Sequence, residues 1–138
     1  MDSLDRRIAL ATKVAWSYHG TWYTWGGDDP SGFDCSGVCI EILKSVGLLP
    51  RSFDATANGL MGMFNKVPAP FEGCLVFWLS GSRAHHVEYC LDELFSIGAS
   101  GGGSHVKTLE DAIKANAWIK VRPIARGGIV HFANPFST

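Results

Sequence analysis

The sequence lacks an excess of positive charge. Its 138 residues contain 12 Lys and Arg against 13 Asp and Glu, which gives a formal net charge of −1 at pH 7. No run of five or more basic residues occurs. Proteins that bind nucleic acids usually carry a basic excess or a basic stripe. We therefore expect no nucleic-acid partner.

Long apolar runs are missing as well. No segment reaches the ~18 uninterrupted apolar residues that a membrane-spanning helix needs, so we expect no membrane insertion. The first residues begin with an acid, and Asp5, Arg6 and Arg7 interrupt them before an apolar run develops. This is not the pattern of a secretory signal peptide. We expect a protein that is made in the cytoplasm without such a signal.

Cysteine is scarce, with four residues: Cys35, Cys39, Cys74 and Cys90. A chain of this length with 46% hydrophobic residues has enough apolar material for a core and needs no disulfide framework. Cys39, Cys74 and Cys90 each lie in an apolar run, which is typical of small buried hydrophobic residues. Three residues separate Cys35 from Cys39, a poor spacing for zinc, and no second close pair follows. We expect no metal and no cofactor.

The hydrophobic pattern changes along the chain, and the length indicates a single domain over residues 1–138. Helical spacing of apolar residues predicts helices over residues 4–18, 35–47 and 108–117, and a short, weak helix within residues 54–64. Short β-branched and aromatic segments predict strands over residues 74–80, 85–91, 94–100, 117–124 and 127–135. Helices first and strands afterwards indicate the α+β class.

The segment YTWGGDDPSGFDCSG, residues 23–37, delivers one cysteine to the start of a predicted helix. Its glycines and its DDPSG turn fix the path of the backbone. Asp34 stands at the N-cap position and Cys35 in the first turn, where free N–H groups and the helix dipole favour a thiolate. The charge of Asp34 opposes this effect, so its carboxylate should be directed elsewhere. Cys35 is therefore a candidate nucleophile.

A histidine on a predicted strand is the candidate general base. Alternation along this strand places His86, Glu88 and Cys90 on one face. A helix start docked against this sheet would hold Cys35 against His86, which is the arrangement of a papain-like thiol hydrolase. His85 should lie at the loop edge and point to the opposite face, and an exchange of roles between the two histidines is the alternative.

Three blocks of the sequence, WYTWGGDDPSGFDCSG, EGCLVFW and HHVEYCLDE, together resemble the motif series of NlpC-type cysteine peptidases. These papain-like enzymes cut the peptide stems of bacterial peptidoglycan. The matching segments run from about Thr21 to Ser100. The resemblance implies an α+β papain-like domain with N-terminal helices packed on a mostly antiparallel sheet. It also implies a cysteine peptidase whose partner is the peptidoglycan stem peptide, cleaved next to D-glutamate.

The resemblance also assigns roles to individual residues. Cys35 matches the nucleophile and His86 the base that takes its proton. Tyr23 matches a tyrosine whose hydroxyl donates to the oxyanion of the tetrahedral intermediate, with the backbone N–H of Cys35 as a second donor. Asp34 and Ser36 match residues that in some members bind the free amine of a stem peptide.

The sequence departs from the family pattern at two positions. A third polar residue usually lies about twelve residues beyond the histidine and orients its ring, but here that position is Gly98. The candidates for this role are Glu88, Ser96, Ser100, His105, a backbone carbonyl or a water. We favour Glu88 as the third catalytic member, and a solvated strand acid is the alternative. Cys74 stands where the family usually has aspartate.

The function and its setting have alternatives. The expected hydrolase fits a phage-encoded lysis or tail enzyme, or a cytosolic enzyme acting on wall fragments. The second hypothesis is a catalytically degenerate module of the same fold that binds cell wall or phage structural proteins. Gly98 favours this module, whereas the intact Cys35 and His86 oppose it. Trp22, Trp25 and Trp78 either line a substrate groove or wedge the core.

Overall fold

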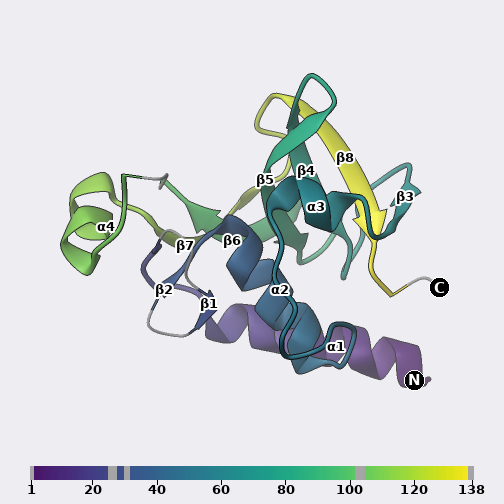
Figure 1. Cartoon of the computed structure of the whole chain (residues 1–138). Coiled ribbons are helices and arrows are strands. Elements are labelled where there is room, and N and C mark those ends of the chain that lie inside the picture. The colour runs from purple at the N-terminus through teal and green to yellow at the C-terminus, as the bar shows by residue number, and fades with distance from the viewer. Residues whose placement is uncertain (1, 25–27, 30–31, 102–104, 137–138) are drawn as a thin grey trace.

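A computed structural model of the chain describes residues 2–24, 28–29, 32–101 and 105–136. The predicted turn glycines Gly26 and Gly27 and the groove candidate Trp25 lie outside the described residues. Twelve elements follow one another along the chain (Figure 1): α1 Ser3–Ser17, β1 Asp28–Asp29, β2 Gly32–Phe33, α2 Cys35–Ser45, α3 Ala57–Met61, β3 Asn65–Val67, β4 Leu75–Ser80, β5 Arg83–Cys90, β6 Phe95–Ser100, α4 Leu109–Ala115, β7 Trp118–Pro123 and β8 Ile129–Asn134.

Six of the strands form one antiparallel sheet in the order β3-β8-β4-β5-β6-β7. The helices α1 and α2 lie along one side of this sheet, and α4 lies near its β7 edge (Figure 1). The strands β1 and β2 pair separately, just before α2. The predicted α+β class, with N-terminal helices packed on a mostly antiparallel sheet, is confirmed.

The helices begin at the residues that local capping rules select. The carboxylate of Asp2 accepts a hydrogen bond from the N–H of Asp5 at 2.8 Å and begins α1. Thr108 and Asp111 form a reciprocal capping box at the start of α4. The four predicted helices are confirmed. The strands β1, β2 and β3 were not predicted, because two or three residues are too few to show alternation.

The main core lies between the helices and the sheet. Ala11 and Ala15 of α1 are fully buried, and their small side chains let the helix approach its neighbours closely. Residues of alternate strand positions complete this cluster, among them Leu75, Phe77 and Tyr89. A second cluster contains the intervening positions: Cys74, Val76, Trp78, Cys90 and Ile124. The sheet is therefore apolar on both faces over its central strands.

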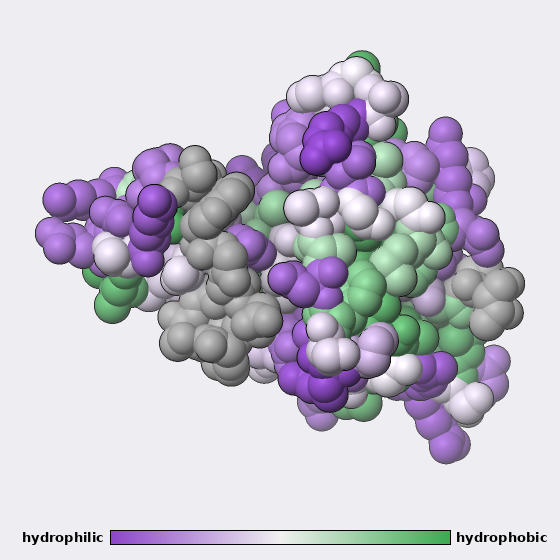
Figure 2. Space-filling view, in the orientation of Figure 1, coloured by the Kyte–Doolittle hydropathy of each residue, from purple (hydrophilic) through white to green (hydrophobic). Residues whose placement is uncertain are grey.

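The three cysteines assigned to apolar runs are buried as predicted, since Cys39, Cys74 and Cys90 are all 0% exposed. Figure 2 shows that hydrophobic side chains on one face gather over the region of α2 and α3, with hydrophilic side chains around them. No helix in the described part of the chain is both long enough and apolar enough to span a membrane.

Candidate functional site

A cavity of about 530 Å³ opens where the start of α2 meets β5, β6 and β7. Its volume falls within the range of small-molecule and peptide sites. The side chains that line it include Tyr23, Cys35, Trp78, His86, Ser100 and Arg122. The sequence-predicted nucleophile, base and oxyanion donor are thus brought to one cavity from segments far apart in the chain.

Cys35 is the first residue of α2, directly after the N-cap residue Asp34. A carboxylate oxygen of Asp34 accepts the N–H of Gly37 at 2.7 Å, and Ser36 donates to the same oxygen from 3.5 Å. The carboxylate is thus engaged in capping, as the sequence required. Unlike the three buried cysteines, Cys35 is partly exposed and therefore accessible from the cavity. Its position places the side chain beside the N–H groups of the first turn of α2.

His86 connects Cys35 to a carboxylate. Its side chain is hydrogen-bonded to Cys35, and its Nε2 lies 2.7 Å from a carboxylate oxygen of Glu88. Burial lowers the pKa of His86, but the hydrogen bonds and charges of Cys35 and Glu88 outweigh it and raise the pKa to about 9. The ring also packs against Trp78, with 5.4 Å between ring centroids. These contacts favour a fixed ring that holds its proton at neutral pH.

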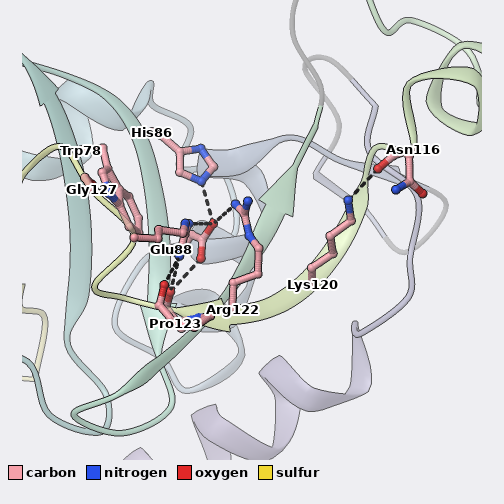
Figure 3. Close-up of polar contacts among 10 residues, drawn as sticks. Trp78, His86, Glu88, Asn116, Lys120, Arg122, Pro123 and Gly127 are labelled. Carbon is pink, nitrogen blue, oxygen red and sulfur yellow. Dashed lines mark hydrogen bonds and ion pairs between the residues drawn. The ribbon is translucent and has the colours of Figure 1, made fainter.

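Glu88 is completely buried, at 0% exposure. One carboxylate oxygen accepts hydrogen bonds from His86 Nε2 at 2.7 Å, Arg126 Nη2 at 2.7 Å and Arg122 Nη2 at 3.2 Å (Figure 3). The other accepts the Ser96 hydroxyl at 2.7 Å. Burial raises the pKa of Glu88. Hydrogen bonding to His86 and the nearby positive charges lower it by more, so the net shift is downward.

The solvated-acid alternative for Glu88 is therefore excluded by its burial. Of the other candidates for the ring-orienting role, Ser96 contacts Glu88 and not the ring. Ser100 lines the cavity, and His105 lies exposed in a turn. Glu88 is the residue that holds the far nitrogen of His86. Its catalytic role remains a prediction that this geometry supports.

The structure corrects the prediction for His85. This residue lies inside β5, not at its edge, and it lines the same cavity as His86. The reason is a β-bulge: Trp78 pairs with His86 and Leu79 with Ala84, so His85 is the extra residue. A bulge breaks the alternation of side chains and can turn two successive residues toward one side. The hydrogen bonds to Cys35 and Glu88 still select His86 as the candidate base.

Tyr23 approaches the cavity from the segment before the cysteine. Its N–H donates to the carbonyl of Ala117 at 2.8 Å, beside an isolated bridge between Trp22 and Trp118. The side chain is 4% exposed, and burial raises its pKa, with further increases from the charges of Cys35 and Asp34. The hydroxyl therefore keeps its proton and can donate a hydrogen bond. This is what the predicted oxyanion role requires.

The site contains two arginines that the sequence analysis did not identify. Arg122 comes from β7, and Arg126 follows that strand and lies over the ring of Trp78, 4.2 Å from its centroid. Both lie in the segment VRPIAR, residues 121–126, but the sequence does not show that Glu88 is buried and therefore requires cationic partners. Among the described residues, no group of three or more His, Cys, Asp or Glu side chains is arranged to hold a metal ion.

A cysteine at a helix start, hydrogen-bonded to a histidine on an antiparallel strand whose far nitrogen meets a carboxylate, defines the papain-like arrangement. The sequence model of the NlpC/P60 family matches residues 20–124, and the chain belongs to this family. The predicted family is thereby confirmed.

Relatives and solved structures agree with this assignment. Protein P54 of Enterococcus faecium is 36% identical over 99 residues, covering 72% of this chain and 19% of its own length. Probable endopeptidase p60 of Listeria grayi is 33% identical over 99 residues, covering 72% of this chain and 18% of its own length. The chain therefore spans less than a fifth of these two relatives.

The crystal structure of the NlpC/p60 domain of the peptidoglycan hydrolase SagA superimposes with a TM-score of 0.71 at 25% identity, covering 91% of this chain and 97% of that domain. The peptidoglycan hydrolase RipB of Mycobacterium tuberculosis gives a TM-score of 0.77 at 20% identity, covering 98% of this chain and 67% of that one. The fold of the described residues is thus that of NlpC/P60 domains.

Proposed function

We propose that this chain is a cysteine hydrolase that cleaves the peptide stems of bacterial peptidoglycan. The observation that carries the proposal is the hydrogen-bonded series from Cys35 through His86 to Glu88, opening on a cavity. The substrate class rests on family membership and on relatives named as a peptidoglycan hydrolase and a probable endopeptidase.

The geometry supports a mechanism of acyl transfer. Glu88 holds Nε2 of His86 and leaves the other ring nitrogen for the proton of Cys35, which yields a thiolate and an imidazolium. The thiolate attacks the carbonyl carbon of the stem peptide. The Tyr23 hydroxyl and the N–H of Cys35 donate to the oxyanion, each donor contributing ~3 kcal/mol to the barrier reduction.

The tetrahedral intermediate then collapses: the C–N bond of the peptide breaks, the proton on His86 passes to the leaving amine, and the acyl group stays on the sulfur of Cys35 as a thioester. Water then attacks the thioester with His86 as base, which releases the carboxylic acid and regenerates the thiol.

We also propose cleavage next to D-glutamate, with the free amine of the stem peptide bound by Asp34 and Ser36. A phage lysis or tail enzyme, or an enzyme acting on wall fragments, would meet this substrate.

The non-catalytic alternative loses the feature that favoured it. Gly98 was its main support, because glycine cannot orient a histidine ring. Glu88 contacts that ring from β5 instead, so the glycine does not imply a degenerate site. No other feature of the described residues favours a binding module over the hydrolase.

The experiment compares the wild type with two cysteine variants from the same helix. Cys35→Ala should abolish the release of new amines from purified sacculi and from a stem tripeptide. Cys39→Ala changes a buried cysteine one turn along α2 and should keep most of the activity. Iodoacetamide should label Cys35 before the three buried thiols, as followed by peptide mass mapping. The hydrolase proposal fails if the wild type releases no more amine than Cys35→Ala.

A further inference from the structure

Two residues that line the cavity each hold a buried side-chain atom without a hydrogen-bond partner. Among the described residues, Nε of Arg122 and the hydroxyl of Ser100 are buried without a hydrogen bond. Ser100 is 6% exposed, and both residues line the cavity that contains Cys35. An unpaired buried donor costs free energy of the order of 1–3 kcal/mol. Unpaired donors beside a cavity can gain a partner when their side chains turn toward a ligand that supplies acceptors.

The positive charges around Glu88 exceed what one carboxylate needs. His86, Arg122 and Arg126 all contact its carboxylate. Arg126 is otherwise fully engaged, because its Nη1 donates to the carbonyl of Pro123 at 2.8 Å and its guanidinium lies over the ring of Trp78. A single positive charge would balance Glu88, so the cluster carries a surplus.

Of the two arginines beside Glu88, Arg122 is the one available to bind a ligand in the cavity. Its bond to Glu88, at 3.2 Å, is longer than the 2.7 Å bond from Arg126. Its side chain is 37% exposed, against 20% for Arg126, so it also reaches the solvent-filled part of the cavity. Figure 3 shows its guanidinium directed toward Glu88 and His86, whereas Lys120 of the same strand is directed away, toward Asn116.

We propose that Arg122 and Ser100 form a subsite that binds a carboxylate of the substrate beside the reacting thiol. A guanidinium matches the two oxygens of a carboxylate, and a serine hydroxyl adds a third donor. The inference rests on the proposed function only for the identity of the substrate, a stem peptide that carries free carboxylates. It makes the enzyme selective for acidic stems over stems in which that carboxylate is an amide.

The test uses a stem tetrapeptide and a series of versions in which one carboxylate at a time is replaced by a carboxamide. Replacement of the carboxylate that binds in the subsite should lower kcat/KM of the wild type by roughly 10- to 100-fold, the factor expected for a lost charge-assisted hydrogen bond. Arg122→Gln should remove this preference, so that the acidic and the carboxamide peptides are cleaved with nearly equal kcat/KM, whatever the loss of its bond to Glu88 does to both rates alike. Ser100→Ala should reduce the preference in part.

Lys120→Gln is the matched control, because it removes the same charge from the same strand but from a side chain bound to the carbonyl of Asn116. It should keep the preference of the wild type. If Arg122→Gln instead slows cleavage of the acidic and amide peptides equally, Arg122 acts only through Glu88 and the subsite is disproved. A wild type without any preference disproves it as well.

Calorimetric binding to Cys35→Ala separates this inference from the proposed function. The hydrolase proposal fails and the subsite stands if three results coincide. The wild type cleaves none of the peptides, Cys35→Ala still binds one acidic peptide tighter than its amide, and the double variant Cys35→Ala with Arg122→Gln shows no such difference. If Cys35→Ala binds the acidic and amide peptides equally, or binds neither, the subsite is overturned.

Discussion

Glu88 occupies the space that a side chain at Gly98 would need. A Cβ built on Gly98 would lie nearest to Cγ of Glu88 and 2.8 Å from its Cδ, closer than real side chains approach. Gly98 lies on β6, next to the strand that carries Glu88 and His86. The glycine at the position where the family has a polar residue thus makes room for an acid on the neighbouring strand.

The partners of Glu88 explain why a fully buried carboxylate is tolerated. Removing a charge from water costs several kcal/mol unless the charge is paired and hydrogen-bonded. Glu88 meets His86, Arg122, Arg126 and the hydroxyl of Ser96, so its oxygens are paired. The cluster places the acid behind the histidine ring, where it can fix the ring and stabilise its protonated form.

Gly98→Ala should therefore damage the site and the fold together. The added methyl group forces Glu88 away from the ring, and overpacking of this kind costs roughly 1–3 kcal/mol of folding free energy. We expect kcat to fall at least 10-fold and the urea midpoint to decrease. Gly62→Ala is the control, since a Cβ there meets its nearest neighbour, the carbonyl of Gly59, at an ordinary 3.7 Å. A Gly98→Ala enzyme with unchanged kcat would contradict the packing argument.

Glu88→Gln tests the charge rather than the shape. The amide fills the same space but leaves the guanidinium groups of Arg122 and Arg126 without their counter-charge. Loss of one partner from a buried ion cluster costs about 3–5 kcal/mol, and loss of the acid behind a catalytic histidine lowers kcat by up to ~10⁴-fold. Equilibrium unfolding and steady-state kinetics measure the two effects. If Glu88→Gln kept both the stability and the kcat of the wild type, Glu88 would be neither structural nor catalytic.

The pKa of His86 predicts how stability and activity depend on pH. It rises from 6.5 to about 9 in the folded chain, so the stability that it contributes is complete below pH 6.5 and is lost as the pH rises through about 9. The difference in unfolding free energy between wild type and His86→Gln should shrink over this interval.

The activity should follow the same titration. The reactive ion pair needs a protonated His86, so kcat/KM should fall on the alkaline side near pH 9. In Glu88→Gln this decline should move to lower pH, because the negative charge that stabilises the imidazolium is gone. A decline at the same pH in both enzymes would mean that another group controls it.

Tyr23→Phe removes only the hydroxyl proposed for the oxyanion. We expect kcat to fall by ~10²- to 10³-fold with little change in KM or stability. Tyr89→Phe is the matched control, because this buried tyrosine shares a 2.9 Å hydrogen bond with Thr12 in the core. Its loss should cost about 1 kcal/mol of stability and leave kcat unchanged. Equal kinetics for the two variants would remove Tyr23 from the mechanism.

The sequence by itself determined the features that depend on neighbouring residues. Asp34 caps α2 and Cys35 follows in the first turn, because capping and the helix dipole act over three or four residues. Alternation located β4 to β8, and the order of helices and strands gave the class. The pairing of Cys35 with His86 came from the order of three motifs, which together specify a known packing of helix on sheet.

Only the tertiary structure decided the surroundings of Glu88. Arg122 and Arg126 lie 34 and 38 residues away along the chain, and β6 brings Gly98 beneath the carboxylate. The bulge at His85 likewise depends on the register with β4. Burial and charge pairing of this kind arise when distant strands meet, so a local pattern leaves a strand glutamate equally compatible with solvent and with a buried ion cluster.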